Sequence, residues 1–257
     1  MRIFINYVKK FIWFIILLAI LYIIQHLINY LSYYQGPLQS LVKYISKIGI
    51  REENILFLLW YVLQIVFTVL ILKCIIRKPL KELGFNFRNK KLGNQYIKIF
   101  FIIYPIIYIG ACLVLYKVMG REILINGRVE KPIHDIIIDI LSYGLLPGIG
   151  EEPLFRVFVV QFLLLTIFKE RKNGDKKTRI GVVLLSSLCF VYGHIYVISW
   201  YPLAMSYSWN QLILAFALGI FYAYTYIKTE SIYAAIVCHN YSDFVYIILS
   251  YIIFYQS

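Results

Sequence analysis

The sequence predicts an all-α polytopic transmembrane helical bundle, folded as a single integral membrane domain over residues 1–257. Three observations support this fold class. Hydrophobic residues make up 61% of the chain and charged residues only 15%, whereas a soluble domain has about 25% charged residues. The apolar residues gather in runs such as 11–24, 55–72 and 99–115, which can cross a bilayer core as helices. No polar stretch between these runs is long enough to fold alone.

We expect about seven spanning helices, one in each segment that the apolar runs define. The segments are 11–33, 55–74, 96–116, 134–168, 180–198, 209–227 and 231–254. The first segment follows Lys9 and Lys10 in the manner of a signal peptide. No small-x-small cleavage site follows it, so we expect an uncleaved helix.

The fourth segment is too long for one straight crossing. As a helix, residues 134–168 would extend about 50 Å, whereas the bilayer core is about 30 Å thick. Residues that break or bend helices stand in its middle, at Gly144, Pro147, Gly148 and Gly150. We therefore expect a kinked segment, with a short interfacial or re-entrant piece at His134–Leu146 and a spanning helix from about Ile149.

Positive charge lies in short loops between the apolar runs. The loop from Lys73 to Lys98 has eight basic residues and one acid, and Lys169–Arg179 has six basic residues and two acids. The loop Tyr196–Asn210 has no charge. The positive-inside rule places the N-terminus and both basic loops in the cytoplasm. Topology and the lipid bilayer account for the net charge of +13, so we expect no nucleic-acid partner.

Several ionisable residues lie inside otherwise apolar segments, where each costs at least ~2.5–3.5 kcal/mol. They are His26, Glu151, Glu152, Arg156, His194, His239 and Asp243. Glu152 and Arg156 are four residues apart on one helix face and can form a structural ion pair. Glu151 points about 100° away and lacks that partner, which suits a general base.

The two histidines of the later segments are the other candidates. His194 follows Phe190 by four residues, so we expect both on one helix face. His239 and Asp243 are also four apart, and a carboxylate can fix the tautomer of an imidazole. Each residue alone could be structural. Three ionisable side chains on three helices, Glu151, His194 and His239, are better explained if the helices converge on one polar cavity. Packing explains His26, and an interfacial turn explains His134, Asp135 and Asp139.

The same residues carry a resemblance to a known family. Glu151-Glu152-x-x-x-Arg156, Phe190-x-x-x-His194 and His239-x-x-x-Asp243 are similar, in order, to the three motifs of the CPBP family of intramembrane proteases. This family includes CAAX prenyl endopeptidases and bacteriocin-processing (Abi) proteins. The motif region covers residues 147–244. Many members have Asn at the position of Asp243.

The resemblance implies peptide-bond hydrolysis in the membrane. Glu151 and His194 would activate water, His239 and Asp243 would stabilise the oxyanion, and Glu152, Arg156 and Phe190 would support the site. An ionised Asp is a poor oxyanion donor, so we expect Asp243 to orient His239 or to be protonated. We favour a mechanism without a cofactor. The alternative is a zinc hydrolase with Glu151, His194 and His239 as ligands.

We expect the substrate to be a peptide or protein in or at the membrane, such as a small lipophilic precursor. The Lys-, Ile-, Tyr- and Asn-rich composition is typical of an AT-rich bacterial genome, which favours a plasma-membrane protein that processes a bacteriocin or signalling peptide, or confers self-immunity. Two non-enzymatic functions remain as alternatives, an immunity protein with a vestigial site and a proton-coupled transporter. A Glu151→Gln variant separates them, because a pure binder should tolerate it.

Overall fold

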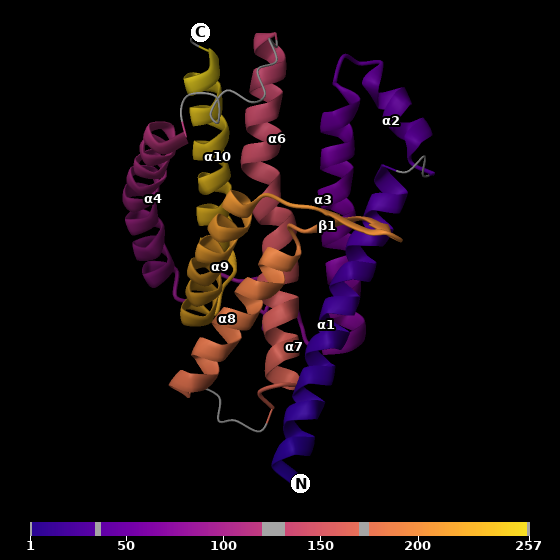
Figure 1. Ribbon diagram of the computed structural model, residues 1–257, viewed down its shortest axis with the longest axis vertical. Helices are drawn as coiled ribbons and strands as arrows, with labels where there is room; N and C mark the ends of the chain where they lie inside the picture. Colours follow the sequence, from indigo (N-terminus) through magenta and orange to yellow (C-terminus); the bar gives the residue numbers. More distant parts are fainter. Residues whose placement is uncertain (1, 34–36, 120–131, 170–174, 256–257) are drawn as a thin grey trace.

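The computed structural model describes residues 2–33, 37–119, 132–169 and 175–255 (Figure 1). Helices dominate these residues, and a single two-stranded hairpin accompanies them. The elements in chain order are α1 (Arg2–Ser32), α2 (Gln39–Ser46), α3 (Glu52–Ile71), η1 (Leu72–Ile76), α4 (Lys90–Met119), α6 (Ile133–Glu152), η2 (Pro153–Phe158), α7 (Val159–Leu165), α8 (Lys176–Tyr192), β1 (Tyr196–Trp200), β2 (Leu203–Ser206), α9 (Trp209–Thr229) and α10 (Tyr233–Tyr255).

Five described helical segments are long and apolar enough to cross a membrane. They are Phe4–Ser32, Glu52–Ile76, Lys90–Val114, Ile133–Leu165 and Trp209–Thr229. The all-α polytopic bundle is therefore confirmed, although fewer helices than the predicted seven meet this requirement. One reason is that α8 has only 17 residues.

The fourth segment corrects the sequence prediction. No re-entrant piece forms at His134–Leu146, because α6, η2 and α7 follow one another without a break as one 33-residue span. The chain instead widens to a π-helix at Pro153–Phe158. Pro153 begins this stretch, and it has no backbone N–H with which to continue the α-helical ladder.

The glycines of α6 allow close packing rather than a break. A Cβ on Gly148 would lie 2.8 Å from the carbonyl oxygen of Ile236 in α10, and one on Gly150 would lie 2.1 Å from the ring of Tyr61 in α3. Both distances are shorter than van der Waals contact. Small residues at these positions let neighbouring helices approach closely, as is typical of membrane proteins.

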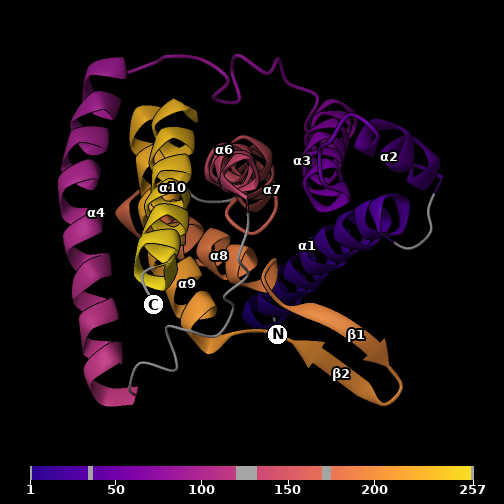
Figure 2. The same ribbon diagram turned by 90° about the horizontal axis from the view of Figure 1, so that it is seen from above.

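The helix formed by α6, η2 and α7 occupies the centre of the bundle when it is seen from above (Figure 2). It packs on α10 and α3, while α8 packs against α9 and α4 lies outside α9 and α10. The N-terminus, η1 and the end of α7 lie toward the same end of the bundle (Figure 1). Residues 170–174 of the second basic loop lie outside the described residues. The cytoplasmic location of the basic end stays a prediction.

Two further details differ from the sequence prediction. Helix α8 ends at Tyr192, so the predicted helix at 180–198 is too long, and the uncharged loop after it contains the antiparallel β1–β2 hairpin. Asp135 and Asp139 do not form an interfacial turn. They lie on the first turns of α6, where both pair with Arg51 at the start of α3.

Candidate active site

The first motif lies at the junction between α6 and the π-helix. Glu151 and Glu152 are the last two residues of α6, and Arg156 follows in the middle of η2. Single π-helical turns within α-helices are frequent at functional sites, because the extra residue per turn changes the direction of the side chains. Here the transition lies directly after the two glutamates.

A buried ion pair holds this junction to α10. Glu152 and Arg156 are both completely buried, and the Nε of Arg156 donates to Oε2 of Glu152 over 2.9 Å. The other oxygen of Glu152 lies 2.8 Å from Nδ1 of His239. An ionised carboxylate can only accept, so Nδ1 of His239 carries the proton and Nε2 faces the other way.

Asp243 contacts the other nitrogen of the same imidazole ring. Its Oδ2 lies 3.4 Å from Nε2 of His239, on the ring edge opposite Glu152. The partner of Nδ1 that orients the imidazole is therefore Glu152 rather than Asp243. Glu151 lies on the same side as Asp243, with its Oε2 3.9 Å from Nε2 of His239.

Phe190 connects the three motifs through its ring. It lies edge-on to both His194 and His239, with centroid distances of 4.8 and 5.7 Å. The guanidinium carbon of Arg156 lies 4.6 Å from the same centroid. Tyr222 stacks on the far side of His239 at 5.0 Å. These contacts fix the positions of the imidazole rings, which agrees with a supporting role for Phe190.

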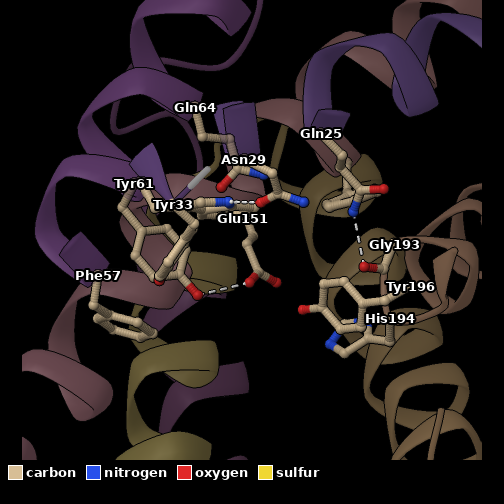
Figure 3. Close-up of a pocket in the computed structure, with 12 residues that line it drawn as sticks. Gln25, Asn29, Tyr33, Phe57, Tyr61, Gln64, Glu151, Gly193, His194 and Tyr196 are labelled. Carbon is tan, nitrogen blue, oxygen red and sulfur yellow. Dashed lines mark hydrogen bonds between the residues drawn. The ribbon is translucent and has the colours of Figure 1, made fainter. Parts of the chain in front are cut away.

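The carboxylate of Glu151 faces a cavity of about 310 Å³ between α1, α3, the α6–η2 junction and the end of α8. Figure 3 shows the carboxylate between Tyr61 on one side and the rings of His194 and Tyr196 on the other. Tyr61 donates a 2.9 Å hydrogen bond to Oε1 of Glu151. The Oε2 atom is buried and has no hydrogen-bond partner among the described residues. One oxygen of Glu151 is thus oriented while the other is free to accept.

His194 lines the same cavity from a position just beyond the end of α8. The predicted helical face shared with Phe190 therefore does not form, but the two residues remain in contact. Nδ1 of His194 lies 2.8 Å from the carbonyl oxygen of Phe190. A carbonyl can only accept, so Nδ1 is the donor and Nε2 of the neutral ring is left as an acceptor.

The remaining lining residues come largely from α1 and α3, to which the sequence assigned no function. They include Gln25, Asn29, Trp60, Tyr61 and Gln64. His239 is not among the lining residues, and its Nε2 lies 3.9 Å from Oε2 of Glu151. His26 stacks on Tyr22 at 5.7 Å. The sequence signal that could have identified these cavity residues is the presence of uncharged polar side chains inside apolar runs. Such side chains cost less free energy in a membrane than charged ones, so their presence is a weaker indication of a site.

The choice between a cofactor-free mechanism and the zinc alternative stays a prediction. The described residues contain no group of three or more His, Cys, Asp or Glu side chains placed to hold a metal ion. His194 lines the cavity, whereas His239 does not line it and is held at Nδ1 by Glu152.

The comparison with known families agrees with the sequence motifs. Residues 133–245 match the family model described as type II CAAX prenyl endopeptidase Rce1-like. No curated protein and no solved structure matched the chain. The matched segment contains Glu151, His194 and His239, and the predicted resemblance to CAAX-type intramembrane proteases is confirmed.

Proposed function

We propose that this chain, which matches the CAAX-type protease family model over residues 133–245, is an intramembrane endopeptidase in which Glu151 and His194 activate the attacking water. The observation that carries this proposal is the state of Glu151. Its Oε1 is held by Tyr61, and its Oε2 is buried beside a polar cavity without a described hydrogen-bond partner. This is the geometry that a general base requires.

The chemistry follows from the atoms that face the cavity. A water molecule between Glu151 and Nε2 of His194 loses a proton to the carboxylate as its oxygen attacks the peptide carbonyl carbon. The proton then passes to the leaving nitrogen as the carbon–nitrogen bond breaks. The developing oxyanion needs a hydrogen-bond donor. Nε2 of His239 can supply it when protonated, because Nδ1 is already held by Glu152.

The proposed substrate is a small membrane-associated or lipophilic peptide. A cavity enclosed by spanning helices favours a chain that enters from the bilayer. Processing of a bacteriocin or signalling precursor, or self-immunity against such a peptide, is the biological role that we favour. We place the protein in the plasma membrane with the N-terminus in the cytoplasm, because the N-terminus and the ends of the basic segments lie toward one end of the bundle.

The test is a set of alanine variants assayed in lipid nanodiscs. The substrate is the membrane peptide fraction of a strain that lacks the protein, and new peptide termini are identified by mass spectrometry. Glu151→Ala, His194→Ala and His239→Ala should each abolish cleavage while inserting and folding normally. His26→Ala is the matched control, because His26 lies outside the cavity, and should cleave at the wild-type rate. Near-normal cleavage by any of the first three variants removes that residue from the mechanism.

A further inference from the structure

Gln64 lies on the face of α3 that covers the candidate active site. It follows Tyr61 by three residues, so the two side chains lie about 4.5 Å apart along the helix axis. Tyr61 binds the carboxylate of Glu151, and Gln64 lines the same cavity. In Figure 3 the Gln64 amide points into the space beside Asn29, on the side of the cavity opposite Gly193 and Tyr196. Gln64 is therefore positioned next to the reacting groups.

The amide of Gln64 is buried without a hydrogen-bond partner. The residue is 1% exposed, and neither Oε1 nor Nε2 has a partner among the described residues. Such groups are rare in native structures, because burying a polar group without a partner is unfavourable. The neighbouring amides differ, since Gln25 donates to the carbonyl of Gly193 and Asn29 accepts from Trp60. The Gln64 amide is thus available to a ligand.

The cavity indicates what kind of ligand this amide would bind. None of the described lining residues is a lysine or an arginine, and the carboxylate of Glu151 is the acidic group present. Arg156 is completely buried and held by Glu152. A free carboxylate placed at Gln64 would therefore have no cationic partner. A neutral group that both donates and accepts hydrogen bonds is the better complement.

We propose that Gln64 is a substrate-binding residue whose amide pairs with an internal peptide unit next to the scissile bond. Its Oε1 accepts from a main-chain N–H and its Nε2 donates to a main-chain carbonyl. Extended residues advance about 3.3 Å each, so the paired unit lies one or two residues from the peptide bond that the activated water attacks. This inference rests on the proposed peptidase function and adds that the enzyme reads neutral main chain rather than a C-terminal carboxylate.

Binding can be measured independently of hydrolysis in a Glu151→Gln background. The probes are acetylated and amidated apolar hexapeptides, and the same peptides with a single main-chain nitrogen methylated at successive positions. Retention of labelled peptide on nanodisc-bound protein gives the dissociation constant. Gln64→Leu should weaken binding about tenfold, the size expected for a buried hydrogen bond. Methylation of the main-chain nitrogen that pairs with Gln64 should weaken binding to the parent protein but not to Gln64→Leu.

Asn54→Leu is the matched control. Asn54 is also a buried amide on α3 without described partners, at 3% exposed, but it does not line the cavity. It should leave peptide binding unchanged. Thermal unfolding separates a structural role, since removing an unpaired amide should not lower the stability of Gln64→Leu.

The outcomes distinguish this inference from the peptidase proposal. If peptide binding depends on Gln64 but the protein with Glu151 intact cleaves no peptide, the binding site is supported and the peptidase function is contradicted. Cleavage with equal peptide affinity in the Gln64→Leu and parent proteins would overturn the binding role alone. The binding role of Gln64 would also be overturned if the parent Glu151→Gln protein bound no peptide, or if it preferred peptides with a free C-terminal carboxylate.

Discussion

Replacing Arg156 should strongly lower the stability of the folded protein, because its charge is buried with that of Glu152. Both side chains are completely buried and share a 2.9 Å hydrogen bond. An Arg156→Met variant keeps much of the side-chain volume but leaves the Glu152 carboxylate with His239 as its remaining described partner. Breaking a buried pair on one side costs about 3–5 kcal/mol. This cost lowers the ratio of folded to unfolded protein by a factor on the order of 10² to 10⁴.

A surface pair in the same chain gives the control. Arg88 and Glu230 lie 3.4 Å apart, but their side chains are 53% and 65% exposed. An Arg88→Met variant should therefore lose at most about 1 kcal/mol. Reversible unfolding in mixed micelles, followed by the fluorescence of the native tryptophans, measures both variants. Equal stability of Arg156→Met and Arg88→Met would refute the view that the buried pair holds the site together.

Three further changes follow from the same geometry. Tyr61→Phe removes the donor to Glu151 and should lower kcat roughly tenfold or more, with normal folding; an unchanged kcat would show that this hydrogen bond does not orient the base. Asp243→Asn should retain hydrolysis, because an amide supplies a donor without a charge, and loss of activity would make the carboxylate itself necessary. Gly148→Ala places a Cβ too close to the side chain of Asn240 and the carbonyl oxygen of Ile236. It should destabilise the bundle by about 1–3 kcal/mol, as measured by thermal unfolding. Gly110→Ala, whose Cβ would have no atom within 4 Å, should leave the stability unchanged.

Much of the candidate site could be predicted from the cost of charge in a membrane. Glu151, Glu152 and Arg156 stand out in an apolar segment, and so do His194 and His239. That cost does not depend on the fold, so sequence alone reveals it. The spacing of four between Glu152 and Arg156 also predicts their contact correctly, because both lie in one helical turn.

Contacts between distant segments could not be predicted in this way. The pairing of Glu152 with His239 joins residues 87 positions apart, and no periodicity reports it. Tyr61 and Gln64 carry no charge at neutral pH, so their presence in an apolar run gave a weak signal. The glycines of the fourth segment were interpreted as a break in the helix. Their function as packing surfaces depends on contacts with α3 and α10, which the local sequence does not reveal.

The most direct test of the central claim is hydrolysis in ¹⁸O-labelled water. Purified protein in nanodiscs is incubated with the membrane peptide fraction, and the products of the wild type and of Glu151→Gln are compared by mass spectrometry, after thermal unfolding has shown that both are folded. The account predicts that the wild type yields products with one ¹⁸O atom in the new carboxylate, and that Glu151→Gln yields none. Equal cleavage by the folded Glu151→Gln variant, or no cleavage by either protein, would contradict the assignment of Glu151 as the base of an intramembrane peptidase.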